Sequence, residues 1–195
     1  YIRITSEDCN NDLIYQIRVK DTLVSATILG SSELIGNVLQ PFTLNTYAES
    51  IDVTLDCKII FHGAFNTYGG QPSHGLLVID KCGNYDTVFM NNFEPGLPSI
   101  SAWQEEGVFV DHEGFIWVSG SLTGLKGRVK KYFPDGTIDG SFDDGVGFNN
   151  YSSKPYVDLD GYIYIGGLFS SYNGTTRQKV IKLKHNGVES DIELL

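Results

Sequence analysis

Basic residues, cysteines and long apolar runs are scarce in this sequence. Its 195 residues include 14 Lys and Arg against 24 Asp and Glu, which gives a formal net charge of −10. A surface of that sign repels phosphate backbones and anionic lipids, so we expect no nucleic-acid partner. No apolar run approaches the ~18 residues that are needed to cross a bilayer, so we expect no membrane insertion.

The three cysteines, Cys9, Cys57 and Cys82, form an odd and sparse set without a CxxC motif or metal-ligand spacing. Cys57 and Cys82 each stand at a predicted turn, and the two turns are expected on one edge of a sheet, two strand spacings apart. At ~4.8 Å per strand, that separation is wider than the ~4.4–6.8 Å between Cα atoms that a disulfide bond allows. The sequence therefore predicts free thiols.

Motifs for catalysis are also missing. The sequence contains no GxSxG elbow, HExxH, P-loop or dinucleotide fingerprint. Three of the four histidines stand at or beside predicted strand ends and turns, where a solvated or capping histidine is expected; the four are His62, His74, His112 and His185. We expect no enzyme and no cofactor, while a glycosidase with dispersed carboxylates stays open as an alternative.

Two acidic segments could attract a calcium ion, because this cation prefers several oxygen ligands. They are "FDDG" at residues 142–145 and "DLDG" at residues 158–161. Neither has the length of a twelve-residue calcium loop. The second segment is in phase with "DHEG" at residues 111–114, which indicates turn chemistry. We therefore expect no metal site.

Glycine and strand-forming residues, by contrast, are abundant and repeat in order. The 22 glycines, together with Tyr, Phe, Val and Ile, indicate an all-β fold with tight turns. The segments "VTLDCKIIFHG", "VDHEGFIWVSG" and "VDLDGYIYIGG" begin at residues 53, 110 and 157. Later turn glycines at positions 83, 136 and 187 are 53 (136 − 83) and 51 (187 − 136) residues apart. This period predicts a propeller or solenoid array.

The middle repeat reads as four antiparallel strands, which would make one propeller blade. A turn is predicted at "PDG", residues 134–136, because Pro fixes its own φ and Gly accepts a positive φ. Phe115 and Trp117 are expected to be buried between blades. The predicted strands are residues 107–111, 115–122, 128–133 and 137–142.

The motifs "DCKIIFHGAF" (residues 56–65), "PDGTIDGSF" (134–142) and "GGLF" (166–169) resemble the delta-sixty repeat, a β-propeller repeat of bacterial surface proteins and of bacteriophage tail and virion proteins. The resemblance covers residues 51–195. Cys57 stands where the motif has a glycine, the middle repeat has "SGSL" in place of "GGxF", and the last exit lacks its aromatic residue. The resemblance implies a structural or adhesive role without common catalytic residues.

We therefore expect an all-β, β-propeller-like array of three four-stranded blades, at about residues 51–100, 101–150 and 151–195. Residues 1–50 do not follow the period and form a small β-module or a degenerate earlier blade. Because the sequence opens at Tyr1 within a predicted strand, we expect a fragment or a processed product.

Aromatic residues gather in the long segments of the predicted blades. Tyr68 and Tyr172 fall in the second turns, and Phe93, Trp103 and Tyr151 fall in the crossovers, which share one edge of the array. Exposed aromatics on one face predict a surface for a ligand or a protein partner. The alternative is that they fill gaps between the blades.

The sequence as a whole predicts a non-enzymatic structural or interaction module, a bacteriophage tail or fibre component located in the virion. A bacterial cell-surface or extracellular location is the alternative. Expected partners are other virion or surface subunits, a second copy of the chain, or a host glycan. The alternative function is a carbohydrate-binding module or a glycan-active enzyme of the cell surface.

Overall fold

The computed structural model describes residues 44–73, 75–80, 83–93, 107–122, 125–177 and 179–190. These residues form antiparallel sheets and hairpins with a single six-residue helix, so the predicted all-β class is confirmed. No helix within these ranges is long and apolar enough to cross a membrane. The predictions for residues 1–43 and for Trp103 concern positions outside the described residues.

The first sheet consists of β1 (Ala48–Val53), β2 (Ile59–Gly63) and β5 (Leu76–Ile79), with β2 in the centre. Between β2 and β5 the chain makes a small hairpin of β3 (Thr67–Tyr68) and β4 (Gln71–Pro72). The helix α1 (Thr87–Asn92) follows β5, and the side chain of Asp86 caps it by accepting a hydrogen bond from the Phe89 amide.

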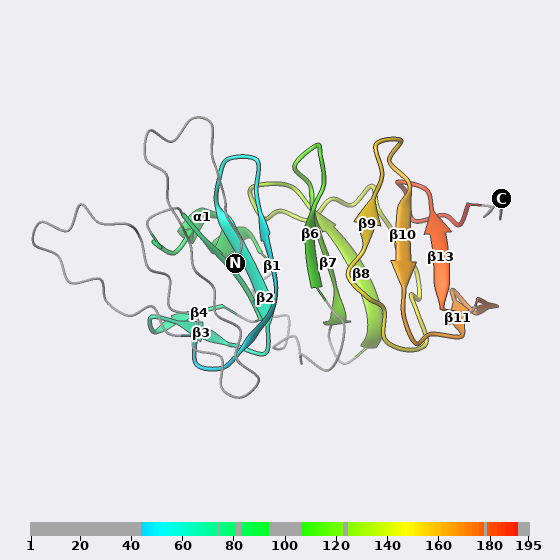
Figure 1. The fold of residues 1–195 in the computed structure, drawn as a ribbon, viewed down its shortest axis with the longest axis horizontal. Coiled ribbons are helices and arrows are strands. Elements are labelled where there is room, and N and C mark those ends of the chain that lie inside the picture. The colour runs from blue at the N-terminus through cyan, green and yellow to red at the C-terminus, as the bar shows by residue number, and fades with distance from the viewer. Residues whose placement is uncertain are drawn as a thin grey trace, which may run out of the picture.

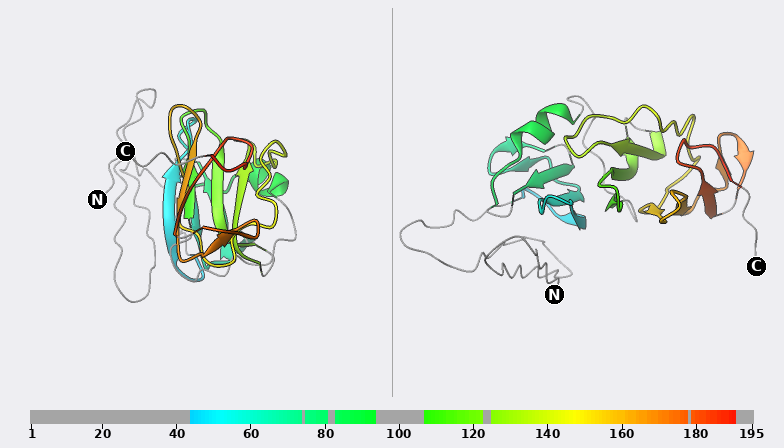
Figure 2. Two further views of the ribbon diagram at one scale, coloured as in Figure 1. Left: turned by 90° about the vertical axis from the view of Figure 1, so that its right-hand side faces the viewer. Right: turned by 90° about the horizontal axis from the view of Figure 1, so that it is seen from above.

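The same plan recurs twice. The second sheet contains β6 (Gly107–Val110), β7 (Ile116–Leu122) and β8 (Leu125–Tyr132). The third contains β9 (Tyr156–Val157), β10 (Ile163–Gly166) and β13 (Val180–Leu183), with a hairpin of β11 (Ser171–Tyr172) and β12 (Thr175–Thr176) before β13. The three sheets stand side by side along the long axis (Figure 1) and overlap when viewed along it (Figure 2).

The fourth strand expected in each blade is reduced to a single β-bridge. In the second repeat, where residues 137–142 were expected to form that strand, only Ile138 bridges to Tyr132. The first and third repeats have the equivalent bridges Ile79↔Tyr85 and Leu183↔Glu189. Each repeat is therefore a three-stranded antiparallel sheet with a short fourth segment at its outer edge.

The first turn of each repeat is held by the same hydrogen bonds. In the second and third repeats, the Oδ1 atoms of Asp111 and Asp158 accept the backbone N–H of the residue four positions later. In the first repeat the Oγ1 atom of Thr54 takes this role. Each turn then needs a positive φ, which is 90° at Gly114, 80° at Gly161 and 63° at Cys57.

Apolar side chains fill the spaces on both sides of the second sheet. On one side, Ile116 and Val118 of β7 join a cluster with the first sheet and α1. On the other side, Trp117 joins a cluster with the third sheet. Alternate residues of one strand therefore face different neighbouring sheets. The Trp117 side chain is 1% exposed, and its Nε1–H donates to Asp111 Oδ2 at 2.7 Å, so its predicted burial is confirmed.

Replacing Trp117 with alanine should remove a large part of the packing between the second and third sheets. We expect the free energy of unfolding to fall by about 3–5 kcal/mol, because a cavity remains where the ring packs. Urea unfolding followed by circular dichroism measures this change. The control, Val146→Ala at an exposed position, should stay within about 0.5 kcal/mol of the wild type. Equal stabilities for the two variants would contradict the assigned position of Trp117 between the second and third sheets.

Cys57 is a free thiol, as predicted, whereas Cys9 and Cys82 lie outside the described residues. Cys57 adopts a backbone conformation that suits glycine better. An L-residue in this region is strained by about 1–2 kcal/mol. Glycine removes this strain but loses more conformational entropy on folding, which offsets part of the stabilisation. Cys57→Gly should therefore stabilise the fold by about 0.5 kcal/mol or more, measured by urea unfolding.

Two matched variants isolate the backbone effect at this turn. Cys57→Ala removes the thiol and keeps the Cβ atom, so it should give no gain. Gly161→Ala adds a Cβ at the equivalent turn with no heavy atom within 4 Å of it, so its cost reports the backbone alone. A gain with Cys57→Ala equal to that of Cys57→Gly would assign the effect to the thiol instead.

Candidate interaction surface

The aromatic residues predicted to share an exposed edge are mostly buried. Tyr68, Phe93 and Tyr172 have almost no exposed surface, and Tyr151 is half-buried. The expectation of exposure is therefore wrong for the first three. Trp103, the fifth residue of the predicted set, lies outside the described residues.

Tyr68 and Tyr172 fasten the small hairpins to the sheets. The Tyr68 hydroxyl donates to the Gly83 carbonyl at 2.8 Å, and the Tyr172 hydroxyl donates to the Gly187 carbonyl at 2.9 Å. Burial, with a smaller contribution from Asp144, raises the pKa of Tyr172 to about 12. Burial also raises the pKa of Tyr68 well above its usual value. Both hydroxyls therefore tie the small hairpins to the third turns of their repeats.

Phe93 belongs to the core between the first and second sheets. Its ring lies 5.1 Å from the ring of Tyr132 and 6.0 Å from that of Phe89, centroid to centroid. Tyr132 is the last residue of β8 and leads into the turn at Gly136. Phe93 therefore lies near the third turns, whereas the prediction placed it on the opposite edge.

The acidic segments considered for calcium have structural roles. Asp158 Oδ1 accepts the amides of Asp160 and Tyr162, as turn chemistry predicts. Asp144 is 0% exposed and forms a two-pronged pair with Arg128, with N···O distances of 2.6 and 2.5 Å. This hydrogen-bonded pair raises the pKa of Arg128. Among the residues that the structure describes, no three His, Cys, Asp or Glu side chains form a group that could hold a metal ion.

His62 is fully buried in the first sheet, so the expectation of a solvated or capping histidine is wrong for this residue. Neither ring nitrogen has a hydrogen-bond partner. Burial lowers the pKa of His62 to about 4 from 6.5, because the charged form would lose its hydration. His112 and His185 are exposed, as expected, and His74 lies outside the described residues.

The neutral state of His62 predicts acid sensitivity. Between pH 6.5 and about 4 the unfolded chain binds a proton at His62 that the folded chain does not bind, so stability is complete above pH 6.5 and falls with acidification. We expect this residue to cost about 2 kcal/mol of unfolding free energy between pH 7.5 and pH 5.

The control for this pH effect is His62→Leu, which cannot take up a proton. Urea unfolding of both proteins at a series of pH values isolates the contribution of the histidine from that of all other groups. The wild type should lose about 2 kcal/mol more than the variant over this range. Parallel stability curves for the two proteins would contradict the assignment.

The first strands of the three sheets are joined by polar contacts. Asp52 of β1 accepts the Val110 amide of β6 at 3.0 Å and pairs with Lys154 Nζ, just before β9, at 3.4 Å. Lys154 Nζ also lies 5.6 Å from the ring centre of Phe109. Ser50 of β1 exchanges hydrogen bonds with the backbone of β6. These contacts connect the first sheet to the second and to the segment that enters the third.

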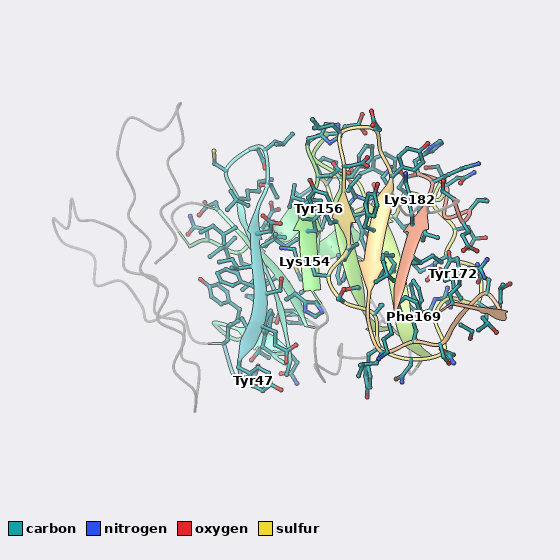
Figure 3. All side chains as sticks on the ribbon, turned by 45° about the vertical axis from the view of Figure 1, so that its right-hand side comes forward. Tyr47, Lys154, Tyr156, Phe169, Tyr172 and Lys182 are labelled. Atoms are coloured by element: carbon teal, nitrogen blue, oxygen red, sulfur yellow. The ribbon has the colours of Figure 1, made fainter. Side chains whose placement is uncertain are left out.

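An aromatic and cationic surface does exist, but on the outer face of the third sheet, the side that faces away from the second. Ile163, Ile165, Ile181 and Leu183 pack toward the second sheet, so alternation places Tyr164, Val180 and Lys182 on the other side. Tyr156 lies opposite Tyr164 in the pairing and shares its side. Figure 3, turned so that this end of the molecule comes forward, labels Tyr156 and Lys182 on the third sheet.

Rings and a cation contact one another across this outer face. Lys182 Nζ lies 3.8 Å from the ring centre of Tyr162 and 5.6 Å from that of Tyr164. The Tyr156 ring is 6.5 Å from that of Tyr164. Because β9 is an edge strand, the same ring also lies 5.6 Å from that of Phe109 in the second sheet. Tyr156 is 58% exposed and Val180 is 56% exposed. This is the candidate interaction surface.

None of these residues was predicted from the sequence, although a signal for them was present. In the aligned repeats, Tyr164 occupies the position of Ile60 and Trp117, which face the next sheet along the chain. Comparing positions across repeats, and not only their turns, would have indicated a face of the third sheet without a following sheet among the described residues.

A family model described as "Domain of unknown function (DUF5122) beta-propeller" matches residues 159–188 of the chain. The match covers most of the third repeat, from its first turn to just beyond its last turn glycine, and it supports a β-propeller repeat family. No curated protein matches the chain.

Proposed function

We propose that the chain is a non-enzymatic structural and interaction module and that it serves as a bacteriophage tail or fibre component in assembly or host attachment. The β-propeller match to the third repeat supports an interaction module. The virion as its location, and other virion subunits as its partners, rest on the resemblance of its repeats to those of phage tail and surface proteins.

The observation that carries the non-enzymatic part is the use of acidic side chains within the repeats. Asp111 and Asp158 cap equivalent turns through the same backbone hydrogen bonds. Asp86 and Asp139 pair with Lys58 and Lys131, each within 2.9 Å. Carboxylates that would be candidates for acid or base chemistry thus hold the backbone in place, at matching positions of successive repeats.

The carbohydrate-binding alternative was based on a set of exposed aromatic residues, and three of them are not exposed. Sugar rings stack on exposed aromatic faces, and Tyr68, Phe93 and Tyr172 are buried. The outer face of the third sheet offers Tyr156 with an exposed ring, so a glycan array with the full chain tests what remains of this alternative. We expect that no glycan binds through Tyr156. Specific glycan binding that is present in the wild type and lost in Tyr156→Ala would favour the sugar-binding function.

The proposed location can be tested by density-gradient fractionation of lysates from the organism that carries the gene, followed by peptide mass spectrometry. We expect peptides of this chain in the fractions with nuclease-protected DNA particles. Envelope proteins in the same gradient serve as the control. Recovery with the cell envelope, and not with particles, would replace the virion proposal by a cell-surface role.

A further inference from the structure

Each described sheet presents a face to the sheet that follows it in the chain. On the first sheet this face carries Ile60, Leu76 and Val78, which are completely buried against the second sheet. On the second sheet it carries Trp117 and Val129, which are buried against the third. The equivalent face is thus an established interface in two successive copies.

The third sheet repeats this face with the same local geometry. In the second sheet, Lys131 Nζ lies 3.6 Å from the ring centre of Phe115 and 5.4 Å from that of Trp117. Lys182 holds the same relation to Tyr162 and Tyr164, at 3.8 and 5.6 Å. The cation lies on equivalent rings in both sheets. The outer face of the third sheet therefore has the structure of a sheet-to-sheet interface, while Val180 on it stays exposed.

One charge distinguishes the third sheet from the second. Lys131 pairs with Asp139, whose amide donates to the Lys131 carbonyl. Ser190 takes the place of Asp139, because its amide donates to the Lys182 carbonyl in the same way. In the described part of the chain no carboxylate pairs with Lys182. A partner that covers this ammonium group has to supply a negative charge, since an unpaired buried charge is costly.

We propose that the outer face of the third sheet docks a further blade-type β-sheet, one that lays Ile, Val or Leu side chains over Tyr164 and Val180 and brings a carboxylate near Lys182. The aliphatic chemistry is that of Ile163, Ile165 and Ile181, which cover the equivalent face of the second sheet. This inference rests on the proposed interaction function and names its surface and the chemistry of its partner.

The first experiment supplies a sheet with the aliphatic side chains and without the carboxylate. Residues 1–190 are followed directly by a second copy of residues 140–190, which continues the repeat register from Ser190. Because neighbouring repeats stabilise one another, the extended chain should melt in one transition, about 5 °C or more above the original chain. A separate low-temperature transition for the added copy, or no rise, would overturn the proposal.

Matched variants show whether the outer face carries the gain. Val180→Lys in the original copy places a second positive charge beside Lys182 in the new interface and should abolish the rise in the extended chain. The original chain should tolerate it, because Val180 is exposed there. Val88→Lys on α1, also exposed, is the control and should leave the rise intact. Equal effects of the two substitutions would overturn the docking surface.

The role of the carboxylate is tested with Ser190→Asp, which supplies Lys182 with the acid that Lys131 has. Its melting-temperature gain should be larger in the extended chain, where Lys182 is covered, than in the original chain, where water solvates it. Equal gains in both would overturn the requirement for a carboxylate.

Two further outcomes would assign the surface to another occupant. Sedimentation of the original chain as a dimer that Val180→Lys dissociates would mean that a second copy occupies the face, and would overturn the proposal. Glycan binding that depends on Tyr164 would do the same in favour of a sugar. None of these measurements bears on where the protein is found, so the gradient experiment on the proposed function can fail or succeed independently.

Discussion

The structure depends on one constraint, which is that each central strand is apolar on both of its sides. In β7, Ile116 and Val118 point to one neighbouring sheet and Trp117 to the other. A strand of this kind gains its full free energy of burial only between two covering layers, because a side left in water does not gain it. The side-by-side order of the sheets and the polar contacts of their first strands both serve this requirement.

Close backbone approach is the second element of the arrangement. A Cβ atom at Gly136 would collide with the carbonyl of Phe89, and one at Gly187 with that of Asp143. The segment that leaves one sheet therefore lies directly against the third turn of the next. Asp144, the neighbour of Asp143, is locked by Arg128 of its own sheet, so the position of this connecting segment is set by a buried ion pair as well as by packing.

The fold could be predicted from the sequence because its signals are local and repeated. The acidic or hydroxyl residue and the glycine of each first turn, and the apolar strand after it, specify each hairpin on their own. The surface could not be predicted in the same way. Tyr68 and Tyr172 stand in polar turn segments, which indicate exposure. They are buried because each small hairpin packs against its own sheet, and the sequence around the two residues does not show this contact. His62 reads as a strand end, yet neighbouring chain covers it completely.

The positive φ angles of Cys57 and Lys179 have a consequence for how such repeats diverge. Both residues adopt a conformation that glycine fills at the matching positions, Gly161 and Gly75, and the surrounding hydrogen bonds are the same. The backbone hydrogen bonds of these turns therefore tolerate a strained residue, so a repeat can lose its glycine and keep its fold. Lys179 lies within residues 159–188, which the family model matches, so a strained residue in place of a glycine changes neither the main-chain path nor the recognisable pattern of that repeat.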